Sequence, residues 1–145
     1  MPNETITKFG YPNTLLKEYR HWVVLLRPKQ VTAGSLILAL KGEAQSMAEV
    51  EEQQFLELTK VTADLETALR TSLAFDKINY LALMMVDKHV HFHVIPRYAQ
   101  ERQICGLTFV DPTWPKPPLL TQVNEISDAQ FRELREILIS NWPQL

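Results

Sequence analysis

The sequence predicts an α+β fold with a mostly antiparallel five-stranded sheet, one long central helix and a second helix near the C-terminus. β-rich segments lie on both sides of a long amphipathic stretch, residues 46–74, and a second amphipathic stretch covers residues 127–141. The order strands, helix, strands, helix is typical of an antiparallel sheet with helices packed against it. At 145 residues, the chain has the length of one domain, so we expect residues 1–145 to form a single unit.

The first half of the sheet is predicted from β-rich segments separated by turn residues. Residues 1–13 are polar and contain two prolines, and we expect them to form an N-terminal arm. Residues 15–26 predict two paired strands with a turn at residues 18–21. Residues 35–40 predict a third strand, which follows a loop that ends in glycine.

The long helix is predicted from its start signal and its apolar periodicity. Ser46 and Glu49 have the spacing of a capping box, which marks the beginning of a helix. Apolar residues then recur at three- and four-residue steps, which places them on one face. These residues are Phe55, Leu58, Val61, Leu65, Leu69 and Leu73.

The second half of the chain predicts two more strands and the second helix. Residues 78–86 predict a buried strand, and residues 89–95 predict a strand that alternates histidine with apolar residues. Residues 98–145 form a C-terminal extension whose helix is expected near 127–141, where Ser127 and Gln130 form a second capping-box pair. Within the extension, the proline-rich residues 112–118 predict an extended surface segment. We expect this segment to bury Phe109 and Trp114 and to be the part of the extension that lies nearest the site.

Composition excludes several classes of partner. The net charge of −2 creates no basic field for DNA or RNA. The apolar runs are too short to span a bilayer, and no charged-then-apolar leader is visible, so we expect no membrane partner. A single cysteine, Cys105, excludes an internal disulfide. These features favour a cytoplasmic protein.

Three of the four histidines lie within five residues, as His89, His91 and His93. Alternate side chains of a strand point to the same face, so the three imidazoles should share one face. Val90 and Phe92 should point to the opposite face, toward a core. Three polar imidazoles on one face are unsuited to a hydrophobic core, so we interpret them as a functional site.

Imidazole is a nucleophile toward phosphorus, and its phospho-adduct is readily hydrolysed, so a histidine can divide a phosphoanhydride or phosphoramidate displacement into two steps. Same-face neighbours on a strand are roughly 6–7 Å apart, which lets flanking histidines reach oxygens of one phosphate. Such neighbours can stabilise the developing negative charge or protonate a leaving group.

The segment from His89 to Arg97 resembles the motif of the histidine triad family, in which His-x-His-x-His is followed by two apolar residues. The resemblance covers residues 14–97 and includes the early strands and the long helix. It implies a nucleotide-binding α+β protein, usually a homodimer, that hydrolyses or transfers a nucleotidyl group through a nucleotidyl-histidine. It also implies that His91 is the nucleophile and that His89 and His93 hold the phosphate oxygens.

The sequence departs from the family pattern at three positions. Ser35 stands where the family often has a fourth histidine, and Met85 and Val86 stand where it usually has polar residues ahead of the triad. The segment 81–86 also contains no glycine. These departures motivate an alternative hypothesis, a nucleotide-binding module with weak or no turnover.

Five further residues are candidates for substrate binding, each with an ordinary structural alternative. Arg97, just past the histidine strand, would bind a phosphate or be a solvated surface arginine. Ser35 would contact a phosphate or be a plain strand residue, and Asn79 would contact the nucleotide or satisfy a local hydrogen bond. Leu26 and Leu36 would cradle the base.

Two other interpretations of the triad stay open at this stage. The histidines would be solvent-facing on an edge strand, or they would ligate a metal such as zinc. For the enzyme hypothesis we expect a nucleoside phosphate or dinucleoside polyphosphate as substrate. The covalent step requires no metal cofactor, although a divalent ion could accompany a polyphosphate.

Overall fold

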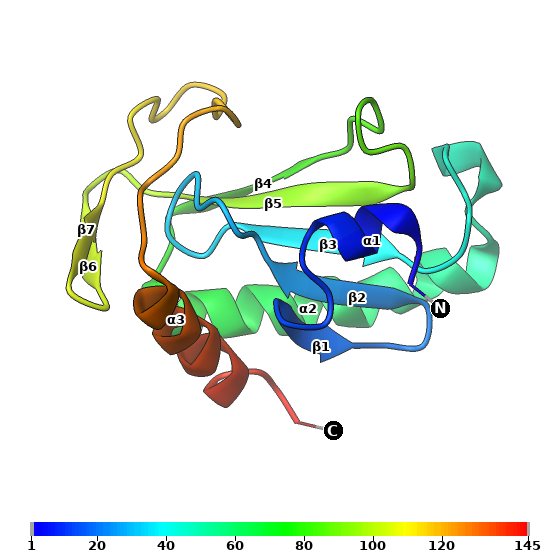
Figure 1. Cartoon of the computed structure of the whole chain (residues 1–145), viewed down its shortest axis with the longest axis horizontal. Coiled ribbons are helices and arrows are strands. Elements are labelled where there is room, and N and C mark those ends of the chain that lie inside the picture. Colours follow the sequence, from blue (N-terminus) through cyan, green and yellow to red (C-terminus); the bar gives the residue numbers. More distant parts are fainter. Residues whose placement is uncertain (1, 145) are drawn as a thin grey trace.

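The computed structural model describes residues 2–144 and contains a five-stranded sheet with helices on both faces (Figure 1). The sheet has the order β1-β2-β3-β5-β4, and all neighbouring strands are antiparallel. Its strands are β1 (Leu15–Glu18), β2 (Trp22–Leu26), β3 (Leu36–Leu40), β4 (Lys77–Leu81) and β5 (His91–Arg97). The remaining elements are α1 (Glu4–Lys8), a 3-10 turn (Met47–Glu49), α2 (Glu52–Leu73), the hairpin of β6 (Arg102–Ile104) and β7 (Leu107–Phe109), and α3 (Asp128–Ser140). The predicted α+β class is confirmed.

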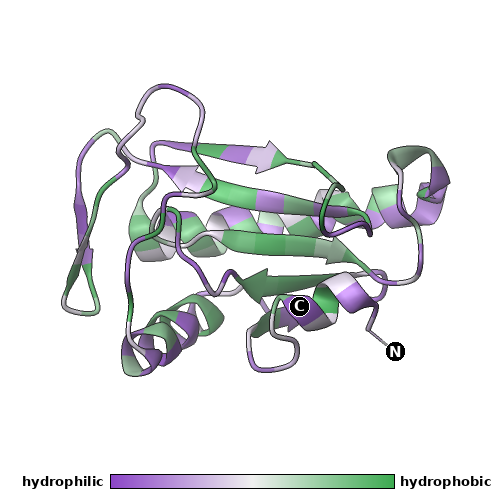
Figure 2. Ribbon diagram, turned by 45° about the horizontal axis from the view of Figure 1, so that its top comes forward, coloured by the Kyte–Doolittle hydropathy of each residue, from purple (hydrophilic) through white to green (hydrophobic). Residues whose placement is uncertain are grey.

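The two faces of the sheet carry two separate apolar clusters. Alternate strand residues, including Val24, Leu38 and Val94, pack under α2 in the main core. The intervening residues, including Leu25 and Ile37, form a smaller cluster under α1 on the opposite face. Figure 1 shows α2 behind the sheet and α1 in front of it, and Figure 2 shows that the central strands are strongly apolar.

The N-terminal residues are packed against the sheet, so the prediction of an arm over residues 1–13 is wrong for the described part. Asn3 caps α1 by accepting a hydrogen bond from the backbone N–H of Ile6 at 2.9 Å. The amide of Asn3 donates to the carbonyls of Leu40 and Gly42, at 3.0 and 2.8 Å. The Ile6 side chain is fully buried in the smaller cluster. Polar composition hid this docking because only one large apolar side chain of α1 reaches the sheet.

The long helix begins later than predicted. The Ser46–Glu49 capping box exists, but it caps the 3-10 turn. Glu51 and Gln54 form a second capping box at the start of α2. Most of the predicted apolar face packs on the sheet, but Phe55, in the first turn of α2, is exposed.

The strand predicted over residues 78–86 is also too long. β4 ends at Leu81, and the chain then forms a loop up to the histidine strand. Met84 has a φ of 45°, a left-handed conformation that interrupts an extended strand. Met85 and Val86 are 77% and 82% exposed rather than buried. Apolar composition alone therefore misled the prediction here.

The predicted C-terminal helix is confirmed as α3, with Ser127 as its N-cap. The residues after α3 tie it to the rest of the fold: Asn141 donates a hydrogen bond to Ser72 at 2.9 Å, and Trp142 donates one to Tyr19 at 2.8 Å. No helix within residues 2–144 has the length and apolar character needed to cross a membrane.

Candidate active site

β5 places two of the three histidines on the α1 face of the sheet. His91 pairs with Ala39, and His93 pairs with Ile37, in the antiparallel register with β3. Phe92 and Val94 face the main core, as alternation predicts. β5 lies between β3 and β4, so the alternative of an edge strand is wrong.

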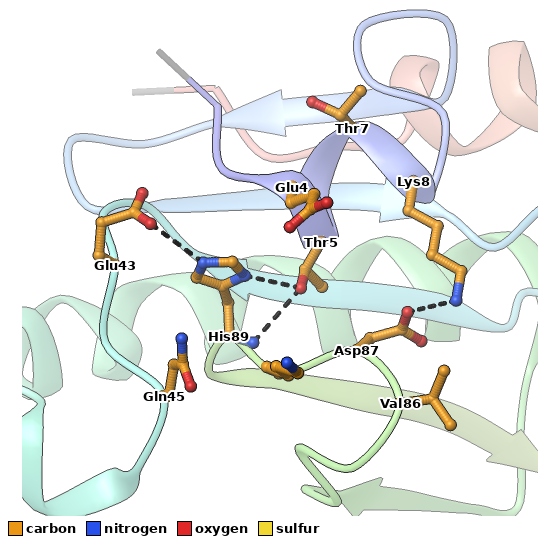
Figure 3. A pocket seen from close by; sticks show the side chains of 10 residues that line it. Glu4, Thr5, Thr7, Lys8, Glu43, Gln45, Val86, Asp87 and His89 are labelled. Carbon is orange, nitrogen blue, oxygen red and sulfur yellow. Dashed lines mark hydrogen bonds and ion pairs between the residues drawn. The ribbon is translucent and has the colours of Figure 1, made fainter.

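His89 differs from its neighbours because it precedes β5 and lies on the loop from β4. Its Nδ1 lies 3.0 Å from the hydroxyl of Thr5 in α1, and its backbone N–H donates to the same oxygen at 3.3 Å. Its Nε2 lies 3.2 Å from a carboxylate oxygen of Glu43 (Figure 3). His89 therefore lies on the α1 face with the other two histidines, but it is held there by Thr5 and Glu43 rather than by strand pairing.

The tautomer of His91 follows from its hydrogen bond. Its Nδ1 lies 2.6 Å from the backbone carbonyl of His89. A carbonyl oxygen can only accept, so Nδ1 must carry a proton. In the neutral ring, the lone pair then resides on Nε2, which is the nitrogen available for nucleophilic attack.

Phe9, just after α1, covers the two histidines of β5. Its ring centroid lies 5.8 Å from that of His91 and 6.0 Å from that of His93. The exposed fractions are 7% for His89, 1% for His91 and 6% for His93. The triad is therefore concealed in this conformation, beneath a short N-terminal segment, residues 3–9, that we call the N-terminal cover.

His93 is held neutral near pH 7. Its pKa is lowered to about 4, chiefly by burial and also by the neighbouring His91 and the charge of Arg27, while the charge of Asp87 opposes the shift. The rings of His91 and His93 meet edge to face, with centroids 5.1 Å apart. A neutral His93 can donate one hydrogen bond to a phosphate oxygen but brings no positive charge to it.

A hollow of about 690 Å³ opens beside His89, as Figure 3 shows. It is lined by residues of α1, by Glu43 and Gln45, and by the loop residues 86–89. Lys8 of α1 and Asp87 of the loop form an ion pair at 2.5 Å across it. Of the three histidines, His89 is the one that lines this hollow.

Arg97 is not a surface residue, and its guanidinium group is bound mainly by other parts of the chain. Its side chain is 4% exposed and forms a bidentate pair with Asp111, at 2.7 and 3.1 Å. It also donates to Asn79, to Thr113 and to the Lys116 carbonyl. The alternative of a solvated surface arginine is therefore wrong, and Asn79 satisfies a hydrogen bond within the same network. The phosphate contact of Arg97 stays a prediction.

Other predicted substrate contacts are corrected. The hydroxyl of Ser35 is buried and bonds with Thr32, from which it accepts at 3.0 Å and to which it donates at 2.9 Å. Leu26 and Leu36 are fully buried in the main core under α2, which is the face opposite the histidines. They cannot cradle a base beside His91.

The proline-rich segment 112–118 lies away from the triad. Its residues contact Arg97, at the end of β5, whereas His89 lies before the beginning of that strand. The expectation that this segment is the part of the extension nearest the site stays a prediction. Phe109 is buried as predicted, and Trp114 is half-buried.

Sequence reasoning missed four residues that surround the triad. Thr5, Phe9 and Glu43 carry no motif, and only the fold brings them to the histidines. Arg27 could have been found, because it follows Leu25 at a two-residue step and so continues the face of β2 that the histidines share. Within residues 2–144, no three His, Cys, Asp or Glu side chains are grouped so that they could hold a metal ion.

A five-stranded antiparallel sheet that gathers three histidines beside one of its faces is the arrangement expected of a histidine-triad protein. Residues 12–100 match the HIT domain family, and the chain therefore belongs to that family. Membership implies a nucleotide-binding protein of the hydrolase or transferase type.

Solved structures of family members share the fold. A histidine triad protein from Sinorhizobium meliloti 1021 is 20% identical, with a TM-score of 0.75, and the match covers 97% of this chain and 96% of that one. One from Marinobacter aquaeolei VT8 is 21% identical, with a TM-score of 0.74 and coverage of 99% and 98%. Histidine triad protein blr8122 from Bradyrhizobium japonicum is 17% identical, with a TM-score of 0.75 and coverage of 98% and 97%. No curated protein matches the chain.

Proposed function

We propose that the protein is a hydrolase or nucleotidyl transferase that acts on nucleoside phosphates or dinucleoside polyphosphates through a nucleotidyl-histidine. The observation that carries the proposal is the hydrogen bond from His91 Nδ1 to the His89 carbonyl, which leaves the lone pair on Nε2. In the first step, Nε2 forms a bond to the α-phosphorus, and the bond from phosphorus to the leaving oxygen or nitrogen breaks. In the second step, water or another acceptor attacks the same phosphorus and restores the imidazole.

The other two histidines receive different roles from their surroundings. His93, neutral and buried beside His91, donates a hydrogen bond to a non-bridging oxygen. His89 lies at the hollow and close to Glu43, where it can hold a second oxygen of the attacked phosphate. Its bonds to Thr5 and Glu43 fix the ring in place.

Substrate can reach His91 only when the N-terminal cover moves. A side chain that is 1% exposed cannot be approached by a phosphorus atom with the in-line geometry that displacement needs. The cover is held by the Asn3–Leu40 hydrogen bond, the Thr5–His89 bond and the Lys8–Asp87 pair. The side chains of Ile6 and Phe9 add apolar packing. Such a short segment can open without unfolding the sheet.

The second candidate is a nucleotide-binding module with no turnover. The burial of His91 favours it, as does the exposure of Met85 and Val86 where the family usually has polar groups. Turnover by the wild-type protein decides between the two candidates.

The test is a steady-state assay on a panel of nucleoside phosphoramidates and dinucleoside polyphosphates. The wild type should release a nucleoside monophosphate, and His91→Ala should lose at least about a thousandfold in kcat, because a nucleophile is removed. His21→Ala is the matched control, because His21 lies in the turn between β1 and β2 and its backbone N–H bonds Glu57 of α2. Nucleotide binding without product from any substrate would favour the binding module.

The homodimer expected from the family stays a prediction. Size-exclusion chromatography with light scattering should give twice the chain mass of 16.8 kDa. A monomer at all concentrations would refute it.

A further inference from the structure

Two buried polar atoms in the described part of the chain lack a hydrogen-bond partner, and both belong to residues of the histidine face. They are Nε of Arg27 and Nδ1 of His93. Nε of Arg27 can only donate, whereas Nδ1 of a neutral His93 donates or accepts according to its tautomer. A buried polar atom without a partner costs about 1–3 kcal/mol, so each one needs an explanation such as a bound water or ligand. Two such atoms on one face of one sheet indicate a place prepared for an acceptor.

The strand register explains how Arg27 comes to this face. Leu25 of β2 pairs with Ile37 of β3, and Ile37 pairs with His93 of β5, so these three side chains form a row across the sheet. Arg27 follows Leu25 by two residues and keeps the same face, and its backbone N–H donates to the Ser35 carbonyl at 2.9 Å. Its Cα is displaced from that of His93 by roughly 10 Å across the strands and about 7 Å along them, so the two side chains must extend toward each other to meet at one bound oxygen.

The charges around Arg27 support the same location. The positive charge of Arg27 lowers the pKa of His93, and the negative charge of Asp87 raises the pKa values of both residues. The three groups are therefore close enough for their charges to interact. Asp87 is itself paired with Lys8 of α1, so a second cation stands at the same opening.

One nitrogen of the Arg27 guanidinium group donates a hydrogen bond, and another has no hydrogen-bond partner. Nη1 of Arg27 donates to the Lys29 carbonyl at 2.6 Å, which fixes the group at the end of β2. The side chain is half-buried, and burial lowers its pKa, which is the cost of holding a cation there. An anionic oxygen is the acceptor that would satisfy Nε and offset this cost.

We propose that Arg27 is a substrate-binding residue that, together with His93, holds an oxygen of a phosphate group next to the one that His91 attacks. The inference rests on the proposed function and narrows its substrate class. On this face of the sheet, the row of side chains that contains Arg27 follows the row of His93, which in turn follows the row of His91. Arg27 therefore lies on the far side of His93 from the phosphorus that His91 attacks. The site then favours substrates with two or more linked phosphates over phosphoramidates, whose leaving group carries no phosphate.

The test compares Arg27→Gln with the wild type on a diadenosine polyphosphate and on an adenosine phosphoramidate. A charge-assisted hydrogen bond is worth about 1.5–3 kcal/mol, so kcat/KM on the polyphosphate should fall roughly 10- to 150-fold. The phosphoramidate should lose less than about threefold, and Arg27→Lys should recover part of the polyphosphate activity. Lys29→Gln is the control, since it removes an exposed charge two residues away. An equal loss on both substrates, or no loss on either, overturns the inference.

A binding measurement separates this inference from the proposed function. Inorganic tripolyphosphate, titrated calorimetrically into wild type and Arg27→Gln, requires no turnover. Weaker binding by at least about tenfold in the variant supports the phosphate contact even if no substrate is cleaved. Unchanged binding overturns the contact even if the wild type proves to be an active enzyme. Thermal midpoints of both proteins establish that the variant is folded.

Discussion

His93 should make the stability of the fold depend on pH between 6.5 and 4. Its pKa is about 4 in the folded protein, against 6.5 for an ordinary histidine, because the ring is buried beside His91 and Arg27. Between pH 6.5 and 4, His93 binds a proton in the unfolded chain but not in the folded protein, so lowering the pH favours unfolding. The contribution of neutral His93 to the free energy of unfolding is fully present above pH 6.5 and is lost as the pH falls to about 4. The full shift corresponds to roughly 3 kcal/mol, and about 2 kcal/mol of this is lost by pH 5.

The assay is urea unfolding of the wild type and His93→Gln at pH 7.5 and pH 5.0. Between the two pH values, the wild type should lose about 2 kcal/mol more free energy of unfolding than the variant, in which nothing titrates at this position. Other groups titrate in both proteins, so the difference isolates His93. A histidine NMR titration gives the pKa independently. A His93 pKa near 6.5, or the same pH dependence in both proteins, would refute the reasoning.

Three further predictions address the cover, the Arg97 network and metals. Ile6→Ala should weaken the N-terminal cover and speed modification of His91 by diethylpyrocarbonate at least tenfold, measured by peptide mass spectrometry; an unchanged rate would contradict the cover. Asp111→Ala should cost about 3–5 kcal/mol in urea unfolding because Arg97 stays buried without its partner, whereas Arg70→Ala, which breaks a more exposed pair with Glu66 in α2, should cost less than about 1 kcal/mol. Chelation with EDTA should leave turnover of a phosphoramidate unchanged, and recovery of lost activity by added zinc would show that a metal takes part.

Local patterns were enough to predict most elements of the fold. The alternation of His91 and His93 with apolar residues correctly assigned the two faces of β5. The Ser127–Gln130 pair located the start of α3 to the residue. These signals succeed because each depends on residues only two to four positions apart.

The wrong predictions concern residues whose surroundings are determined by contacts between distant parts of the sequence. Leu26 and Leu36 were assigned to the site, but the pairing of Ile37 with His93 places the alternate residues of β2 and β3 on the histidine face. Alternation is visible in one strand, whereas the register between strands is set by the folded sheet. Arg97 was misjudged for a similar reason, since its partner Asp111 lies fourteen residues later.

The N-terminal cover was the largest omission. Thr5 and Phe9 are far from the triad in sequence, and a short polar helix gives little sign that it will dock on a sheet. Its effect on function is substantial, because it determines whether His91 can be reached.

Covalent attack by His91 is the central claim, and intact-protein mass spectrometry tests it most directly. The protein is mixed with the panel of nucleoside phosphoramidates and dinucleoside polyphosphates and quenched without acid within one turnover. The wild type should gain the mass of one nucleotidyl group, and His91→Ala should gain none. A nucleotidyl adduct that persists in His91→Ala, or product formation by that variant at the wild-type rate, would contradict the account.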